Sequence, residues 1–378
     1  MRRKPLILPV SLCMAVSLSA GAPVQALAGS PEFARSAEEW ARLRDNVLEY
    51  EEIEDLIHEY NATVLNNEQE YSKDTARTAE DVVDDLLDVA DDHWRDAGDA
   101  EDNMSMILSQ VSARQAENQA ENNVDDRGTK LIQYTLTEKK LVIQAQTAMN
   151  TYYKLQYQLT SLKKNREMLE TALTSAQGRQ SQGMATYADV LTAQQNLQSV
   201  DAQVIALENQ IETTRQNLIV MLGWTQGAVP EIRSMPAVDM ERIPAIDPEA
   251  DKAKAMEADY TLKMHEMNLE NSTNDANRRI YEQTIADDKQ QIAMAVSDAY
   301  QKVIQAKNSY DESLLKLDVA SKTWNTSATK FQLGTISRLE YLQADADMVA
   351  AQMDVEAKNL ELFQALESYD WVVRGVRS

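Results

Sequence analysis

The feature that most restricts the fold of this chain is a turn motif that occurs twice, 151 residues apart. The first copy runs from Gln182 to Gln194 and the second from Leu333 to Asp345. Each has a glycine, followed by a hydroxyl residue after three positions, an acid after six, a leucine after eight and an alanine after ten. A hydroxyl residue with an acid three positions later forms a capping box at a helix start, and the glycine permits the positive φ that ends the preceding helix. We therefore expect two tight turns, each joining two long antiparallel helices.

The residues that follow each turn repeat the spacing of a coiled coil. Apolar, small or aromatic side chains alternate at steps of three and four, with Thr214 and Lys358 as the exceptions, at Val190, Ala193, Leu197, Val200, Val204, Leu207, Ile211, Thr214, Leu218 and Met221, and at Tyr341, Ala344, Met348, Ala351, Val355, Lys358, Leu362, Ala365, Tyr369 and Val372. Such a seam predicts coiled-coil packing, and its duplication predicts two units packed side by side. The predicted fold class is all-α, with long antiparallel coiled-coil helical hairpins in two tandem repeats.

The N-terminus has the pattern of a signal peptide, assigned to residues 1–28. Basic residues 2–4 precede the largely apolar stretch 6–18, and residues 26–28 form a small-x-small cleavage site. No later stretch has the ~20 uninterrupted apolar residues that a membrane-spanning helix needs. We expect an exported protein of the cell envelope without a helical membrane anchor.

Charge and residue usage argue against several classes of function. The 37 basic and 61 acidic residues give a net charge of −24, which disfavours nucleic acid and anionic lipid as partners. Cys13 is the one cysteine and lies in the signal peptide, so the mature chain has no disulfide or thiolate metal site. No nucleophile–base set or phosphate-binding loop is present, and the histidines His58, His93 and His265 are too scattered for a zinc site. We expect no enzyme activity, no cofactor and no metal.

Prolines and glycines divide the chain. A first helical-hairpin repeat is predicted at 29–223, a proline-bearing connector at 224–248 and a second repeat at 249–378. Residues 33–64 are expected to be amphipathic and helical. Residues 129–176 are expected to form one long helix that leads to the first turn, and 249–331, which lack glycine and proline, one that leads to the second.

An acidic insert, residues 68–126, interrupts the first repeat. It contains 18 acidic and four basic side chains, a net charge of −14. Some apolar spacing persists, so we expect a strongly acidic helix followed by a mobile linker, with breaks at Gly98 and Gly128. The run from Asp91 to Asp96 fits a solvated acidic face better than a divalent-cation site, because it lacks the glycine of a calcium loop.

With these motifs, the chain resembles the TolC-like outer-membrane efflux factor family. The resemblance rests on the paired turns, on Leu222–Gly223 at the end of the first hairpin and on the Ala299–Tyr300 pair, and it covers residues 133–224 and 249–373. It implies a homotrimer in which each protomer contributes two helical hairpins to a hollow α-barrel. It also implies docking on a periplasmic adaptor and an inner-membrane pump, and transport without catalysis.

The resemblance assigns roles to the two turns. The adaptor-docking tips would be Gly183, Met184, Ala185 and Thr186 in the first turn and Gly334, Thr335, Ile336 and Ser337 in the second. Met184 and Ile336 are expected to be exposed apolar groups there. Asp189 and Glu340 are either N-cap partners alone or also a ring of acids at the pore aperture.

The chain departs from the family pattern where each half of a family member has a pair of membrane strands. Here those positions hold the acidic insert and the polar stretch 271–291, and neither has the alternating pattern of a lipid-facing strand. We therefore expect the coiled-coil part without a transmembrane β-barrel. The alternative to a conduit is an extracytoplasmic coiled-coil scaffold or binding protein without transport activity. A simple coiled-coil fibre fits less well, because the proline-bearing connector favours hairpins that fold back.

Overall fold

The computed structural model describes residues 30–73 and 78–377. The predicted signal peptide at 1–28, with Cys13, lies outside these residues. The described chain is helical apart from turns, short 3₁₀ segments and one parallel pair of two-residue strands, β1 (Val47–Leu48) and β2 (Glu231–Ile232). The all-α prediction is therefore confirmed. Within the described ranges, no helix combines the length and apolar character needed to cross a membrane.

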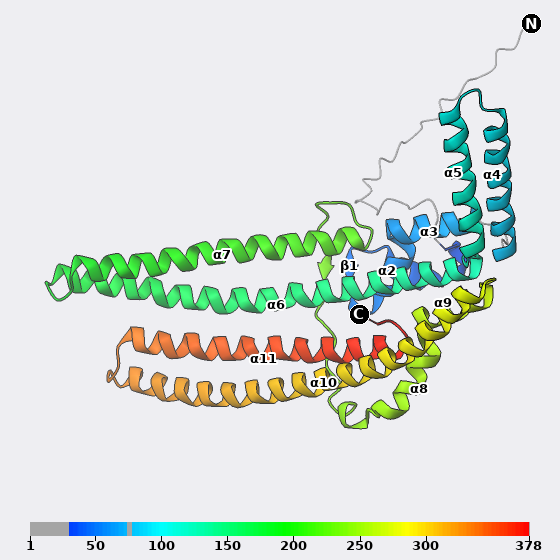
Figure 1. Cartoon of the computed structure of the whole chain (residues 1–378). Coiled ribbons are helices and arrows are strands. Elements are labelled where there is room, and N and C mark those ends of the chain that lie inside the picture. Colours follow the sequence, from blue (N-terminus) through cyan, green and yellow to red (C-terminus); the bar gives the residue numbers. More distant parts are fainter. Residues whose placement is uncertain (1–29, 74–77, 378) are drawn as a thin grey trace, which may run out of the picture.

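Two long helical hairpins dominate the molecule. The first consists of α6 (Arg127–Ser181) and α7 (Tyr187–Met221), and the second of α10 (Asp275–Gln332) and α11 (Arg338–Val373). Figure 1 shows them side by side with both turns at the same end, and the first turn reaches further out. The inner helices α6 and α11 pack against each other, and α7 and α10 form the outer edges.

The predicted coiled-coil seams hold the hairpins together. Every seam position of α7 and α11 is buried or half-buried, including the exceptions Thr214 and Lys358. Most positions of α7 outside the seam are exposed. Because burial of apolar surface contributes ~25 cal/mol per Å², this continuous stripe stabilises the antiparallel pairing along its whole length.

Shorter elements surround the end of the hairpins opposite the turns. They are η1 (Glu32–Ala34), α1 (Ala37–Leu43), η2 (Tyr50–Glu52), α2 (Ile53–Tyr60), α3 (Ala62–Lys73), η3 (Ile243–Ala245), α8 (Pro248–Ala258) and α9 (Tyr260–Asn271). Two hydrophobic clusters form there. Trp40, Ile53 and Ile57 pack with residues of α6 and α7, and Leu262 and Ile292 pack with residues of α11.

The prediction that residues 33–64 are helical is wrong in part. The segment wraps around the base as separate short elements, and residues between α1 and η2 form strand β1 against the connector. Asn61 ends α2: its side-chain nitrogen donates to the carbonyl of Met221 at 2.9 Å, and its side-chain oxygen accepts from the backbone of Thr63 at 2.9 Å. These contacts outweigh the amphipathic pattern because they satisfy backbone groups at a buried helix end.

The prediction of one helix over 249–331 is also wrong. The range divides into α8, α9 and α10, with breaks at Asp259 and at residues 272–274. The Asp259 carboxylate accepts from the backbone of Leu262 at 2.7 Å, and the Asn274 side chain accepts from the backbone of Asn277 at 2.7 Å. Short polar side chains can start a new helix in this way without any glycine or proline.

The acidic insert is a second kind of hairpin, formed by α4 (Ala79–Asp99) and α5 (Asn103–Asn122), which projects sideways from the base in Figure 1. The predicted acidic helix is α4. The predicted mobile linker is wrong, because Asp102 caps α5 and small side chains of α5 pack against α4. Gly98 lies inside α4 and Gly128 inside α6, so the breaks fall beside these glycines.

Candidate functional site: the hairpin tips and the grooves between the hairpins

The first tip joins α6 to α7 through two linked motifs. Gly183 has φ +74°, and the backbone of Met184 donates to the carbonyl of Arg179 at 2.8 Å, which closes α6. The hydroxyl of Thr186 accepts from the backbone of Asp189 at 3.2 Å, and the Asp189 carboxylate accepts from the backbone of Thr186 at 2.7 Å. The reciprocal capping box fixes where α7 begins.

The second tip has the same construction. Gly334 has φ +69°, and the backbone of Thr335 donates to the carbonyl of Lys330 at 2.9 Å. The hydroxyl of Ser337 accepts from the backbone of Glu340 at 3.2 Å, and the Glu340 carboxylate accepts from the backbone of Ser337 at 2.7 Å. The chain therefore presents two equivalent turns at one end.

Asp189 and Glu340 are engaged in these boxes and are open to solvent. Hydrogen bonds from the backbone and hydroxyl of Thr186 lower the pKa of Asp189, and those from Ser337 lower the pKa of Glu340. Both carboxylates are therefore charged at neutral pH. Their geometry accounts for the capping role, and a role at a pore remains a proposal.

The apolar surface of the tips differs from the prediction. Met184 is exposed at 65%, as expected, but Ile336, which occupies the position of the half-buried Ala185 of the first tip, is itself half-buried. The sequence did not single out two apolar side chains of the tips that are more exposed than Met184: Tyr187 at 73% and Leu333 at 72%. Their signal was their position: Tyr187 directly follows the capping Thr186, and Leu333 directly precedes the turn glycine.

A groove of about 790 Å³ lies between the hairpins near the tips. It is bounded by α6 on one side and by the start of α11 on the other, and its lining includes Glu167, Glu170, Arg179, Ser337 and Arg338. The second tip thus faces the flank of α6, because the first hairpin extends beyond it (Figure 1).

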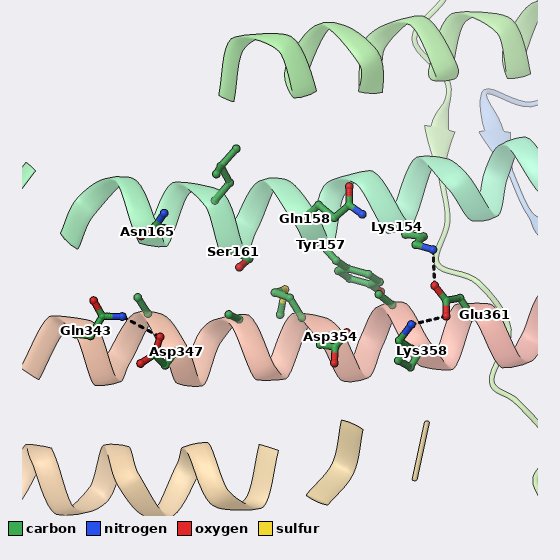
Figure 2. A pocket seen from close by; sticks show the side chains of 15 residues that line it. Lys154, Tyr157, Gln158, Ser161, Asn165, Gln343, Asp347, Asp354, Lys358 and Glu361 are labelled. Carbon is green, nitrogen blue, oxygen red and sulfur yellow. Dashed lines mark hydrogen bonds and ion pairs between the residues drawn. The ribbon is translucent and has the colours of Figure 1, made fainter. Parts of the chain in front are cut away.

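A second groove, of about 530 Å³, follows the same junction toward the base. Figure 2 shows Tyr157 and Ser161 pointing from α6 toward α11. The facing side of α11 mixes polar side chains with three alanines, Ala346, Ala350 and Ala357, whose small size leaves room for the groove. Burial raises the pKa of Tyr157, so its hydroxyl is protonated at neutral pH.

Ion pairs join the hairpins at each end of this second groove. Lys154 contacts Glu361 toward the base, and Lys164 Nζ lies 2.6 Å from Oδ2 of Asp345 toward the tips. Glu361 also accepts from Lys358 at 2.7 Å (Figure 2). Burial acts to raise the pKa of Glu361, but hydrogen bonds from the two lysines outweigh it and lower that pKa.

The arrangement offers surfaces for binding more than groups for chemistry. Among the described residues, no cluster of three His, Cys, Asp or Glu side chains is placed to hold a metal ion. His58 and His265 each pair with a carboxylate, Glu138 and Asp288 respectively, on different helices of the base. The two matched turns expose apolar groups next to polar grooves.

Two solved structures share this architecture at low sequence identity. A membrane protein from Pseudomonas aeruginosa matches with a TM-score of 0.50 and 13% identity over 68% of this chain and 73% of that protein. The outer-membrane channel OprN matches with a TM-score of 0.50 and 12% identity over 90% of this chain and 92% of that protein. No protein-family model and no curated protein matches the sequence. At this identity the likeness is one of fold: the chain has a helical-hairpin fold similar to that of an outer-membrane channel.

Proposed function

We propose that this protein is a TolC-like component of the cell envelope. Three copies assemble into a helical conduit that docks through its tips on a periplasmic adaptor and an inner-membrane pump. The chain performs no catalysis in this role, and it acts by enclosing a path. The fold-level similarity to an outer-membrane channel supports the proposal.

The observation that carries the proposal is where the exposed apolar side chains of the hairpins lie. Among the described residues, α11 exposes no large apolar side chain and α6 exposes only Leu131. The outer helices expose several: Leu191, Ile205 and Val220 on α7, and Ile280, Met294, Leu314, Leu315 and Val319 on α10. The two hairpins thus form one layer of helices with an exposed apolar edge on each side. This arrangement fits a ring in which α7 of one copy packs on α10 of the next.

The tips supply the docking surface in this proposal. Met184, Tyr187 and Leu333 are exposed at the end that both hairpins share. The capping boxes hold the backbone of each tip in one geometry, so a partner meets preformed turns. Asp189 and Glu340 place negative charge on the same end, which favours cations near the opening.

The test is a cross-link between the two edges. Ile205→Cys and Leu315→Cys, combined in a Cys13→Ser background, place one thiol on each outer helix. A closed ring gives disulfide-linked species up to a trimer under mild oxidation, and sedimentation gives the mass of three chains. A protein that sediments as a monomer without this cross-link contradicts the conduit and favours the scaffold alternative.

A further inference from the structure

The α4–α5 hairpin is held at its root by three asparagine side chains from the second half of the chain. Asn271 Nδ2 donates to the carbonyl of Val124 at 2.9 Å, and Asn274 Nδ2 donates to the carbonyl of Glu121 at 3.1 Å. The amide of Asn277 donates to the side chain of Asn122 at 3.3 Å. These bonds tie the foot of α5 to the junction between α9 and α10, at the base of the long hairpins (Figure 1).

The outer face of α5 forms an exposed apolar stripe. Ala113, Ala116 and Ala120 are buried, and they form the face that packs on α4. Away from that face, Met104, Ile107, Leu108 and Val111 follow helical spacing and are exposed at 67%, 50%, 59% and 49%. Residues 103–113 contain no charged side chain.

Nine of the 13 acids of the hairpin lie on the other helix, α4. Residues 79–122 contain 13 acidic and two basic side chains, and the exposed face of α4 carries Asp84, Asp85, Asp88, Asp91 and Asp92. The hairpin is therefore amphipathic: α4 carries most of its charge, and residues 103–113 of α5 are uncharged and expose the apolar stripe. An apolar stripe of this kind is stabilised by burial against a surface that brings no unpaired charge.

We propose that the apolar stripe of α5 packs against the same stripe of a second copy of this chain. A lipid surface would call for Lys and Arg beside Trp or Phe, whereas residues 100–122 contain one basic side chain, Arg114, and no aromatic residue. A basic protein partner would find most of its complementary acids on α4, away from the stripe. A second copy brings a matching uncharged surface and leaves the acids of both α4 helices in water, away from each other.

This contact is separate from the proposed contact between α7 and α10 of neighbouring copies and does not depend on it. It explains why a strongly acidic hairpin keeps four exposed apolar residues in register. It also assigns a role to Asn271, Asn274 and Asn277, because a hairpin that is held in place loses less conformational freedom when it binds a second copy.

The first experiment is disulfide cross-linking of the full chain in a Cys13→Ser background, which has no other cysteine. Leu108→Cys places a thiol in the stripe, and Asp92→Cys on α4 is the matched control. Mild oxidation is expected to convert most of the Leu108→Cys protein, and little of the control, to a covalent dimer. Equal dimer yields from the two variants, or a higher yield from the control, would overturn the proposal.

The second experiment measures affinity. Leu108→Asp is expected to weaken self-association at least tenfold in sedimentation, while Val89→Asp on α4, at a side chain that is 47% exposed, leaves it unchanged and both keep the wild-type circular dichroism. Unchanged self-association of Leu108→Asp would contradict the proposal. The proposal would also be contradicted if the wild type, but not Leu108→Asp, floated with phosphatidylcholine–phosphatidylglycerol vesicles, because the stripe would then bind lipid. The Ile205–Leu315 cross-link reports on the conduit separately, so either idea can fail alone.

Discussion

Lys164 of the first hairpin lies 2.6 Å from Asp345 of the second, at the end of the second groove that lies toward the tips. Asp345 also accepts from the indole nitrogen of Trp324 at 2.9 Å. One carboxylate therefore connects α6, α10 and α11. Beyond it, toward the tips, the wider groove separates the hairpins.

Asp345→Asn is expected to let the tips move apart. Asparagine keeps an acceptor for Trp324 but loses the charge that holds Lys164, and the loss of stability stays below about 1 kcal/mol because the pair is partly exposed. Spin labels at positions 184 and 335 should report a broader, longer distance distribution. Asp347→Asn, at a carboxylate that accepts from Gln343 of its own helix at 2.9 Å, is the control. An unchanged distribution in Asp345→Asn would show that this ion pair does not position the tips.

The Lys164 contact is also expected to persist at neutral pH. Hydrogen bonds from Lys164 to Asp345 and Glu167 raise the pKa of Lys164 above its ordinary 10.5. A raised lysine pKa stabilises the fold below pH 10.5, and this contribution is lost as the pH rises through the raised value. The label distances should therefore stay constant from pH 6 to 9.

Two glycines of α6 and its turn are expected to respond to alanine with opposite signs. Gly183 has φ +74°, and an added Cβ would meet nothing within 4 Å, so Gly183→Ala costs about 1 kcal/mol through backbone conformation alone. Gly178 is helical and equally free of neighbours, so Gly178→Ala stabilises by about 1 kcal/mol. Urea unfolding measures both. A shift of the same sign in the two variants would mean that the turn does not require a left-handed residue.

Arg377 is expected to be the most sensitive charged position of the base. Its guanidinium contacts Oδ2 of Asp259 and Oδ1 of Asp288, each at 2.9 Å, and these carboxylates are 1% and 5% exposed. Arg377→Ala removes the guanidinium that two buried acids share, although Asp288 keeps His265 and Asp259 keeps its bond from the backbone of Leu262, and it should cost about 3 kcal/mol in urea unfolding. Arg374→Ala, which removes an exposed guanidinium over Trp371, should cost less than about 1 kcal/mol. Comparable losses in the two variants would contradict the buried-pair account.

His58 is expected to make stability depend on pH. Its Nδ1 lies 3.2 Å from Glu138, and this hydrogen bond raises the pKa of His58 above 6.5 despite partial burial. The stabilisation is fully present below pH 6.5 and is lost as the pH rises through the raised value. Free energies of unfolding measured from pH 6 to 9 should fall less steeply in both His58→Gln and Glu138→Gln than in the wild type. A wild-type slope in either variant would exclude this pair as its source.

Much of the candidate site could be predicted because its motifs are local. Thr186 and Asp189, like Ser337 and Glu340, interact across three residues, so the capping boxes are readable from spacing alone. The exposure of Tyr187 and Leu333, and the partial burial of Ile336, could not be read in this way. These depend on what packs over each turn, and equivalent positions of the two turns carry different side chains.

The sequence by itself determined the two turns, the coiled-coil seams and the all-α fold, because each follows from interactions within a few residues or from helical period. Only the tertiary structure decided where the rods break, because Asp259 and Asn274 act as caps where packing bends the chain at the base. It also decided that α4 and α5 form a hairpin anchored by Asn271, Asn274 and Asn277. The amide contacts of that root join residues about 150 positions apart, and no local pattern specifies such pairings.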